Sequence, residues 1–274
     1  MSQKYFDIGK CIYCGTQEGK LTTEHIIPFG LGGKLTLENS CCESCRRITS
    51  KCELNPIREN WEHVRAYRNY PSRRRKFDKE KFDLNVVFKD GTEGVLKVSK
   101  DELMAITPFL EYKLPAVLRG YKEKRGIEIN AVSHYIFGVD AENFAQKYNV
   151  KSFSIKSEHK GNSFEIMLAK IAYCFAIACL GVGCFKEIFV LPAILGQKDD
   201  IGLWVGCDHS GVVVPLLGKQ QSECAAKVFV KNFENSSDQF LVVRLKFFAN
   251  TDTPEYIVIV GMLKDNCSTL HKAS

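Results

Sequence analysis

The chain has 274 residues, of which 45% are hydrophobic and 26% charged, and its net charge is +6 at pH 7. This composition is typical of a globular protein and excludes a long disordered segment. The length is sufficient for one small module and one larger domain. The first ten residues lack the apolar core of a signal peptide, so the sequence predicts a cytoplasmic protein.

The spacing of the cysteines indicates a metal site near the N-terminus. Two Cys-x-x-Cys pairs are present, Cys11 with Cys14 and Cys42 with Cys45. Four thiolates in two close pairs suit the closed tetrahedral site of structural zinc, so we expect these four residues to bind Zn2+. By spacing, Cys41 could replace Cys42 as a ligand, but we expect Cys41 and Cys52 to be small buried side chains. The other six cysteines show no disulfide framework.

The segment between and after the two pairs predicts a hairpin followed by a helix. Residues Leu21 to Ile27 have the composition of a strand, residues 28–34 form a glycine-rich turn, and residues 35–37 form a short return strand. The run from Glu43 to Leu54 lacks glycine and proline and favours a helix. Zinc would therefore hold a hairpin against a helix.

The string EHIIPFGLGG followed by LENSCCESC resembles the zinc-supported branch of the HNH endonucleases, also called ββα-metal nucleases. Their pattern is Cys-x-x-Cys, Asp/Glu-His-Ile-x-Pro, a Gly-Gly turn, an Asn, and Cys-x-x-Cys followed by Asn or His. The resemblance covers roughly residues 8–55, about a fifth of the chain. It is specific because the elements up to and including the second Cys-x-x-Cys pair occur in the same order.

The resemblance implies roles for individual residues. His25 corresponds to the general base that activates water, Glu24 to the acidic residue that helps to hold a catalytic divalent ion, and Asn39 to the residue that steadies the loop or His25. Phosphodiester hydrolysis needs a base and positive charge at the phosphate. A histidine, with a reference pKa of about 6.5, is largely neutral at pH 7 and can accept a proton. Mg2+ or Mn2+ would supply the charge.

Arg46 departs from the family pattern, because it stands where the family has Asn or His. Guanidinium has hydrogen-bond donors and no acceptor, so Arg46 cannot bind a cation. Three readings remain open. Glu43 or Glu53 replaces the missing metal ligand, Arg46 and Arg47 clamp the scissile phosphate, or this protein has lost cleavage and kept binding.

Positive charge is concentrated directly after the motif. Residues 46–81 contain twelve Lys and Arg against five Asp and Glu, a net charge of +7. Basic side chains interleaved with Trp61, Tyr67 and Tyr70 favour contact with a polyanion, with phosphates neutralised and aromatic rings packed on sugar or bases. A solvated linker around Ser72 to Lys76 is the alternative. We also expect a helix from Asn55 to Tyr70, opened by Asn55-Pro56.

The remainder of the chain predicts a mixed α+β domain. A hairpin is expected over 82–99 around Asp90-Gly91, short helices or loops over 101–125, a helix over 141–149, and a buried helix from Asn162 or Ser163 to Leu180. Strands are expected over 201–207, 212–217, 226–233, 239–249 and 255–263. Their pattern predicts an antiparallel sheet covered by the helix. The apolar run 171–183 is too short to span a membrane.

The predicted fold class is therefore α+β, with a zinc-bound ββα HNH module and its basic extension over 1–75 and an α+β domain of unknown role over 76–274. The predicted function is a metal-dependent endonuclease that hydrolyses DNA, with RNA not excluded as a substrate. The alternative is a zinc-stabilised nucleic-acid-binding or regulatory protein without cleavage. A homodimer is a hypothesis, because one HNH site cuts one strand at a time. No membrane partner is expected.

Overall fold

The computed structural model describes residues 3–72, 77–154, 161–208, 224–232, 238–249, 251–265 and 267. The basic run 73–76 and the strand expected over 212–217 lie outside the described residues. Short 3-10 turns, which connect the larger elements, are η1 (Phe29–Leu31), η3 (Phe77–Lys79), η4 (Lys100–Glu102), η5 (Ala116–Arg119) and η6 (Val182–Cys184).

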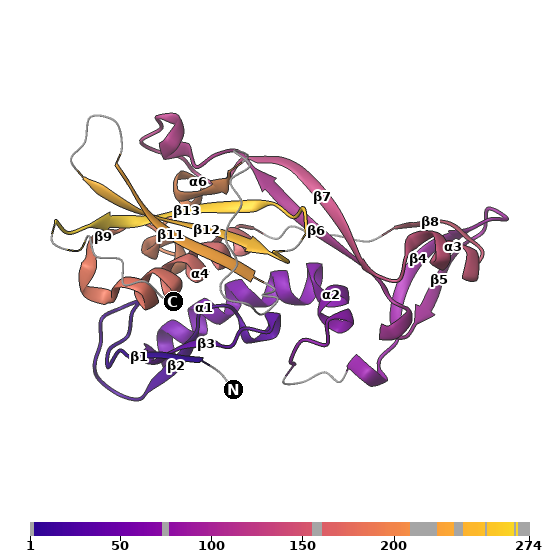
Figure 1. The fold of residues 1–274 in the computed structure, drawn as a ribbon, viewed down its shortest axis with the longest axis horizontal. Helices are drawn as coiled ribbons and strands as arrows, with labels where there is room; N and C mark the ends of the chain where they lie inside the picture. Colours follow the sequence, from indigo (N-terminus) through magenta and orange to yellow (C-terminus); the bar gives the residue numbers. More distant parts are fainter. Residues whose placement is uncertain are drawn as a thin grey trace.

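The N-terminal segment forms the predicted hairpin and helix. Strand β2 (Leu21–His25) pairs antiparallel with β3 (Leu35–Cys42), and α1 (Glu43–Asn55) begins directly after β3. Strand β3 is longer than the predicted return strand. A further strand that the sequence analysis did not predict, β1 (Gln3–Asp7), pairs parallel with β3 to give the order β1-β3-β2. These elements lie at the bottom of the view in Figure 1.

The prediction of a new helix opened by Asn55-Pro56 was wrong. The chain passes from α1 into a π-helical turn, η2 (Pro56–Asn60), and then into α2 (Glu62–Tyr67). Asn55 has helical dihedral angles and makes no side-chain cap. The turn is closed by the amide of Trp61, which donates to the carbonyl of Pro56 at 3.1 Å. In this i→i+5 turn the hydrogen bond uses the carbonyl of Pro56, and the chain stays helical on both sides of the proline.

The C-terminal half forms the predicted antiparallel sheet. Its order is β10-β13-β12-β11, with β9 also paired to β13. The first four residues of the strand expected over 201–207 are instead a helical turn. The bounds are β9 (Phe185–Ile188), α5 (Leu191–Ile194), α6 (Ile201–Trp204), β10 (Val205–Cys207), β11 (Cys224–Asn232), β12 (Gln239–Phe247) and β13 (Glu255–Leu263).

Helix α4 (Ser163–Leu180) has the predicted bounds and lies between this sheet and α1 (Figure 1). It is long and apolar enough to cross a membrane, but 78% of its apolar window is buried inside the protein. The prediction of a buried core helix is confirmed. Helix α4 has one acidic residue, Glu165, and one basic residue, Lys170. Both are completely buried.

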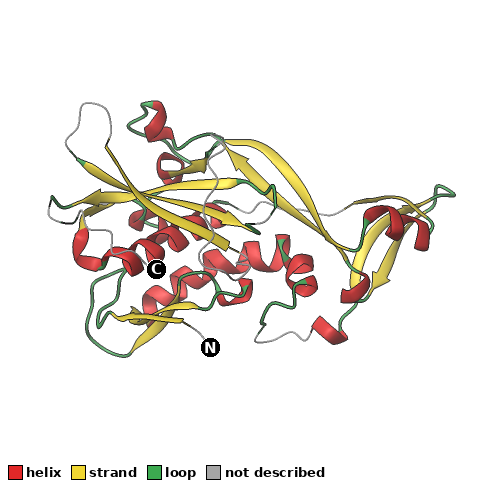
Figure 2. Ribbon diagram, viewed as in Figure 1, coloured by secondary structure: helices red, strands yellow, loops and turns green. Residues whose placement is uncertain are grey.

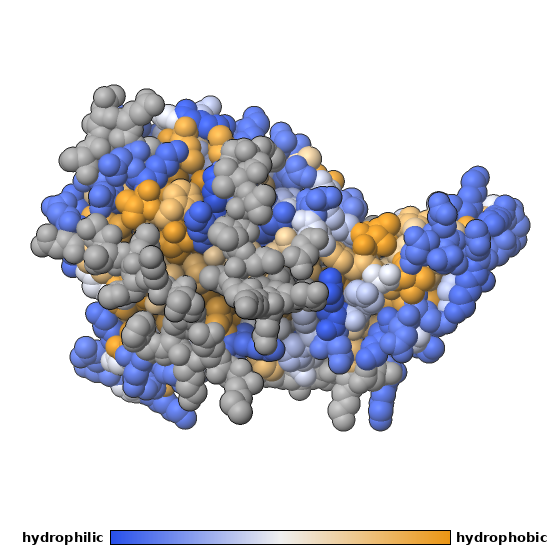
Figure 3. Space-filling model, viewed as in Figure 1, coloured by the Kyte–Doolittle hydropathy of each residue, from blue (hydrophilic) through white to orange (hydrophobic). Residues whose placement is uncertain are grey.

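A smaller lobe projects from this body (Figure 2). The predicted hairpin at Asp90-Gly91 is confirmed, and Gly91 adopts a φ of +88° in its turn. A long hairpin of two further strands connects the lobe to the body, and the lobe's outer end is hydrophilic (Figure 3). The bounds are β4 (Phe82–Phe88), β5 (Glu93–Val98), β8 (Val150–Ser154) and α3 (Ala141–Lys147) in the lobe, and β6 (Met104–Tyr112) and β7 (Ile129–Gly138) in the connection.

The prediction of short helices or loops over 101–125 was therefore wrong in part, since β6 fills its first half. Pro108 lies in the middle of β6, opposite His134 of β7. A strand can accept a proline where no ladder partner needs its amide. The Pro108 carbonyl accepts a hydrogen bond from the indole of Trp61 at 3.3 Å. This hydrogen bond therefore connects β6 to the helical segment after the N-terminal module.

One cluster of buried hydrophobic residues runs from Cys11 to Leu263 without a gap between the N-terminal and C-terminal parts. Trp61 lies in it with 2% of its surface exposed, and its ring contacts Phe109, Phe164 and Phe247 at centroid distances of 5.1, 5.6 and 4.8 Å. The boundary near residue 75 stays a prediction.

Replacing Trp61 with alanine should lower the free energy of unfolding by about 3–5 kcal/mol, because it empties a site lined by three aromatic rings. Urea denaturation followed by circular dichroism measures the change. Tyr67→Ala, six residues further along the chain and 41% exposed, is the control and should cost less than about 1 kcal/mol. An equal loss in the two variants contradicts this account of the core.

Candidate active site

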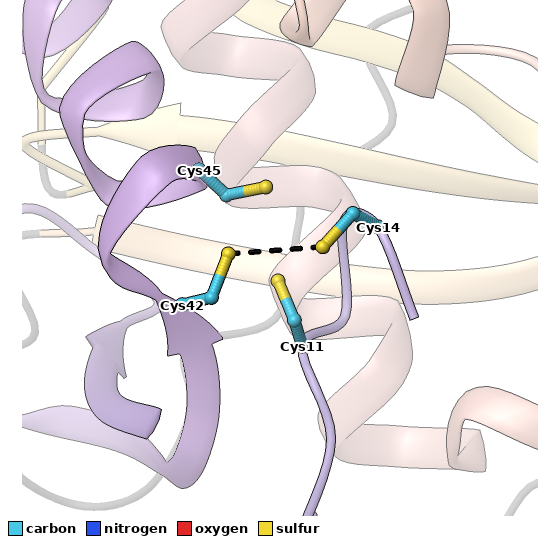
Figure 4. Close-up of side chains that lie close together, drawn as sticks. All are labelled: Cys11, Cys14, Cys42 and Cys45. Carbon is cyan, nitrogen blue, oxygen red and sulfur yellow. Dashed lines mark hydrogen bonds between the residues drawn. The ribbon is translucent and has the colours of Figure 1, made fainter. Parts of the chain in front are cut away.

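The four predicted cysteine ligands lie together. The sulfur atoms of Cys11, Cys14, Cys42 and Cys45 all lie within 4.8 Å of one another, and Figure 4 shows them pointing toward a common centre. The Cys14 and Cys42 sulfurs are 3.7 Å apart. Tetrahedral zinc with Zn–S bonds of about 2.3 Å requires an S–S edge of about 3.8 Å. The donor set and its geometry therefore fit structural zinc.

The electrostatics of the cluster also fit a cation. Burial raises the pKa of Cys45, and the neighbouring Cys42 thiol raises it further. The pKa of Cys42 falls to about 6 although burial opposes this, because hydrogen bonds from Ser44 and from the Cys45 backbone stabilise its thiolate. Loss of the proton from Cys42 is thus favoured, and loss of the proton from Cys45 is disfavoured. A bound Zn2+ would stabilise all four thiolates together. As predicted, Cys41 and Cys52 are buried outside the cluster.

A glycine turn sets the end of β2, where His25 stands. A Cβ atom on Gly33 would lie 1.9 Å from the carbonyl oxygen of Ile27, so only glycine fits there. Arg65 of α2 contacts the same turn, since its guanidinium donates to the carbonyl of Gly30 at 2.7 Å. It also donates to the carbonyls of Ile57 and Pro71 at 3.2 and 3.4 Å. These contacts fix the chain that leaves β2.

His25 is half-buried at the last position of β2, opposite Thr36 of β3. Its ring lies 5.6 Å from the ring of Phe29, which is 38% exposed. Its backbone carbonyl accepts a hydrogen bond from the ammonium of Lys170. The Nδ1 atom of the imidazole is buried, whereas the residue as a whole is half-buried.

Glu24 and Glu53 converge on one cation, and that cation comes from outside the motif. The Lys170 ammonium lies 2.5 Å from a carboxylate oxygen of Glu24 and 2.8 Å from one of Glu53. Glu24 is contributed by β2, Glu53 by the last turns of α1, and Lys170 by α4. The sequence analysis named Glu24 with either Glu43 or Glu53 as ligands of a divalent ion, and it did not anticipate the lysine between Glu24 and Glu53.

Burial and charge oppose each other in this group. Burial by itself lowers the pKa of Lys170, but the carboxylates of Glu24 and Glu53 outweigh it, and the pKa lies well above its usual value. Burial raises the pKa of Glu53, an effect that Lys170 reduces. The ammonium is therefore charged over the whole physiological range, because its two anionic partners stabilise it.

Glu43 lies apart from this acidic pair. It is exposed in the first turn of α1, where it binds Arg46 at 2.8 Å and Arg47 at 3.1 Å. These hydrogen bonds lower the pKa of Glu43, with that from Arg46 the largest. Arg46 and Glu53 are seven residues apart, which is close to two helical turns, so they lie on the same flank of α1. Arg46 therefore adds positive charge to the side of the helix that carries Glu53.

Asn39 has a left-handed backbone conformation with a φ of +46°, which asparagine tolerates better than most residues. It stands where the pairing of β2 and β3 changes register, between Thr22 and Glu24. Its side-chain amide donates to Asp7 at 3.1 Å. This contact ties β1 to β3. The expected role of Asn39, to steady the loop or His25, stays a prediction.

The aromatic residues expected to contact nucleic acid are mostly in the core. Trp61 is 2% and Tyr70 8% exposed, so the prediction that they pack on sugar or bases was wrong, and only Tyr67 is exposed. Arg65 is 6% exposed and committed to backbone carbonyls. Periodicity alone could not separate these buried positions from the solvent-facing ones, because both lie on the same helical segment.

A comparison with known families decides what the module is. Residues 11–52 match the family model of the HNH endonucleases. No curated protein and no solved structure gives a significant match. The HNH match begins at the first cysteine ligand and ends beside Glu53, so it contains the four thiols, Glu24, His25 and the start of α1. It does not reach α4.

The acidic residues of the HNH module do not fit a catalytic Mg2+ or Mn2+ as they stand. Such ions take oxygen ligands in near-octahedral geometry at about 2.0–2.1 Å for Mg2+. The place between Glu24 and Glu53 is filled by the Lys170 ammonium, and Glu43 is engaged by Arg46 and Arg47. The reaction proposed below therefore uses no divalent ion.

Lys170 is the residue of this site that sequence reasoning missed. A lysine in the middle of a helix whose other charged residue is Glu165 was a usable signal, because a buried charge needs a partner of opposite charge. The partners could not be read from the sequence, since they lie 146 and 117 positions away along the chain.

Proposed function

We propose that the protein is an endonuclease that hydrolyses phosphodiester bonds of DNA with His25 as the general base. The observation that carries the proposal is a half-buried imidazole at the end of β2, inside a module that matches the HNH endonucleases. A base in this position can take a proton from water without reaching through the core. RNA remains a second substrate class to be tested beside DNA.

In the proposed reaction the imidazole of His25 takes a proton from a water molecule, and the water oxygen forms a bond to phosphorus. The bond between phosphorus and the leaving sugar oxygen breaks, and that oxygen receives a proton from solvent. Arg46 and Arg47 would bind the phosphate, since their guanidinium groups are exposed beside each other on α1 with side-chain exposures of 46% and 75%. Zinc would hold the scaffold and would contact no reacting atom.

A nicking assay with supercoiled plasmid, together with a cleavage assay on a labelled RNA, tests the proposal. The zinc-loaded chain is assayed in buffer without added divalent ion, with Mg2+ and with Mn2+. Conversion of the supercoiled form to the nicked form by the wild-type protein is the expected result. Binding of DNA without cleavage of either substrate in all three buffers would contradict it.

A second candidate function is nucleic-acid binding without cleavage. Two cations favour it, since Arg46 stands where the family has Asn or His and Lys170 occupies the place between Glu24 and Glu53. In that case the module serves as a zinc-stabilised binding or regulatory unit. The same nicking assay separates the two functions.

Removing a phosphate contact should weaken DNA binding in a salt-dependent way. Arg46→Ala and Arg47→Ala are each expected to reduce the slope of log affinity against log salt by about one, because each neutralised phosphate releases counterions. Fluorescence anisotropy at several salt concentrations measures the slope. Lys97→Ala, on β5 in the projecting lobe, is the control of equal charge. A slope unchanged in both arginine variants would remove them from the interface.

A further inference from the structure

Helix α4 brings a fully buried cation into the HNH module. Lys170 has no exposed surface, and it is the only lysine among the fully buried residues of the described chain. Its helix belongs to the part of the protein beyond residue 76, whereas its partners belong to the module. A buried ammonium at such a position needs complete compensation, since an isolated buried charge is costly.

Three oxygen atoms of the HNH module surround the ammonium. They are a carboxylate oxygen of Glu24 at 2.5 Å, one of Glu53 at 2.8 Å and the backbone carbonyl of His25, which accepts a hydrogen bond. The Glu53 oxygen contributes charge rather than a hydrogen bond, because its geometry does not meet that of an acceptor. Lys170 has no exposed surface from which to reach a substrate phosphate, so any effect that it has on the reaction passes through these neighbours.

These are the oxygen atoms that a divalent ion would need. Two carboxylates from β2 and α1 and one carbonyl converge on a single point beside His25. A divalent cation placed there would stand within a few ångströms of the ammonium, and like charges at that distance repel strongly.

We propose that Lys170 takes the place of a divalent ion in this HNH module. It forms ion pairs with Glu24 and Glu53, holds the carbonyl of His25, and leaves the zinc-loaded protein without a divalent-ion site beside His25. Lys170 is thus a positioning residue that couples α4 to the module. The proposal rests on the proposed function for its catalytic meaning, but its ion-binding content is measured without cleavage.

Titration with Mn2+ followed by electron paramagnetic resonance tests the proposal on the full, zinc-loaded chain. Wild-type protein and Glu53→Gln should bind Mn2+ equally weakly, because no site uses Glu53. Lys170→Ala removes the competing cation and should gain one Mn2+ per chain, with an affinity at least about tenfold above wild type. The double variant Lys170→Ala/Glu53→Gln should lose this gain. Lys170→Arg, which keeps the charge, should behave as wild type.

Other outcomes overturn the proposal. One Mn2+ bound to wild-type protein and released in Glu53→Gln would show that the lysine yields to the ion. No gain in a folded Lys170→Ala would show that the lysine has a purely structural role. If Lys170→Ala does not fold, the comparison of wild type with Glu53→Gln still decides. Failure of the nicking assay leaves these binding results standing, so the two proposals fail independently.

Discussion

His25→Ala is expected to reduce the rate of plasmid nicking by about 10²–10⁴-fold, which is the usual contribution of a positioned general base. The side chain contributes little to the core, because it is half-buried at the end of β2. Its backbone carbonyl, which Lys170 holds, remains in the variant. The zinc content and the fold should therefore be unchanged while the chemistry is lost.

Initial rates of nicking, measured at equal zinc content, give the result for His25→Ala. His134→Ala is the matched control, since His134 is exposed on β7, away from the module. The control should retain the wild-type rate. A His25→Ala protein that nicks at the wild-type rate would remove the imidazole from the mechanism, even if the HNH match stands.

Cys45→Ser is expected to release zinc and to unfold the module. Structural zinc in small modules contributes about 10–16 kcal/mol of apparent binding free energy, which appears as folding free energy. Cys45 is 5% exposed in the first turn of α1, so its loss removes a ligand and detaches the start of the helix that carries Glu53. Cys14→Ser removes a ligand on the exposed side of the cluster and should also lose zinc.

Metal analysis and circular dichroism of the purified variants measure this effect. Cys52→Ser lies seven residues further along α1, is buried outside the cluster, and donates a hydrogen bond to the Thr49 carbonyl that a serine can also donate. It should keep its full complement of zinc. Zinc content that is unchanged in Cys45→Ser would exclude this residue as a ligand.

The HNH module was predictable because its signals are local. Two cysteine pairs, a strand ending in Glu24-His25, and Gly33 at a position that only glycine can occupy all lie within the segment from Cys11 to Glu53. Helix α4 and strands β11, β12 and β13 were also predicted, because their apolar residues follow clear helical or strand patterns.

The features that were missed depend on contacts between distant segments. Strand β6 carries Pro108, which locally favours a loop, but pairing with β7 and the indole of Trp61 hold it extended. Strand β1 is stabilised by β3, more than 30 positions later. The position of Lys170 in an apolar helix signals a buried partner, but the identity of that partner is not local, because both carboxylates that bind it lie more than 100 positions away along the chain. Charge pairing across the fold cannot be derived from periodicity.

The contacts of the Trp61 indole limit which part of the chain can fold by itself. A polypeptide ending near residue 75 would leave this ring without Phe109, Phe164 and Phe247 and would strip the cation from Glu24. Expressed by itself, such a fragment should aggregate even when supplied with zinc. A longer fragment that keeps these contacts would need β6, α4 and β12 as well, because Phe109, Phe164 and Phe247 lie on these three elements.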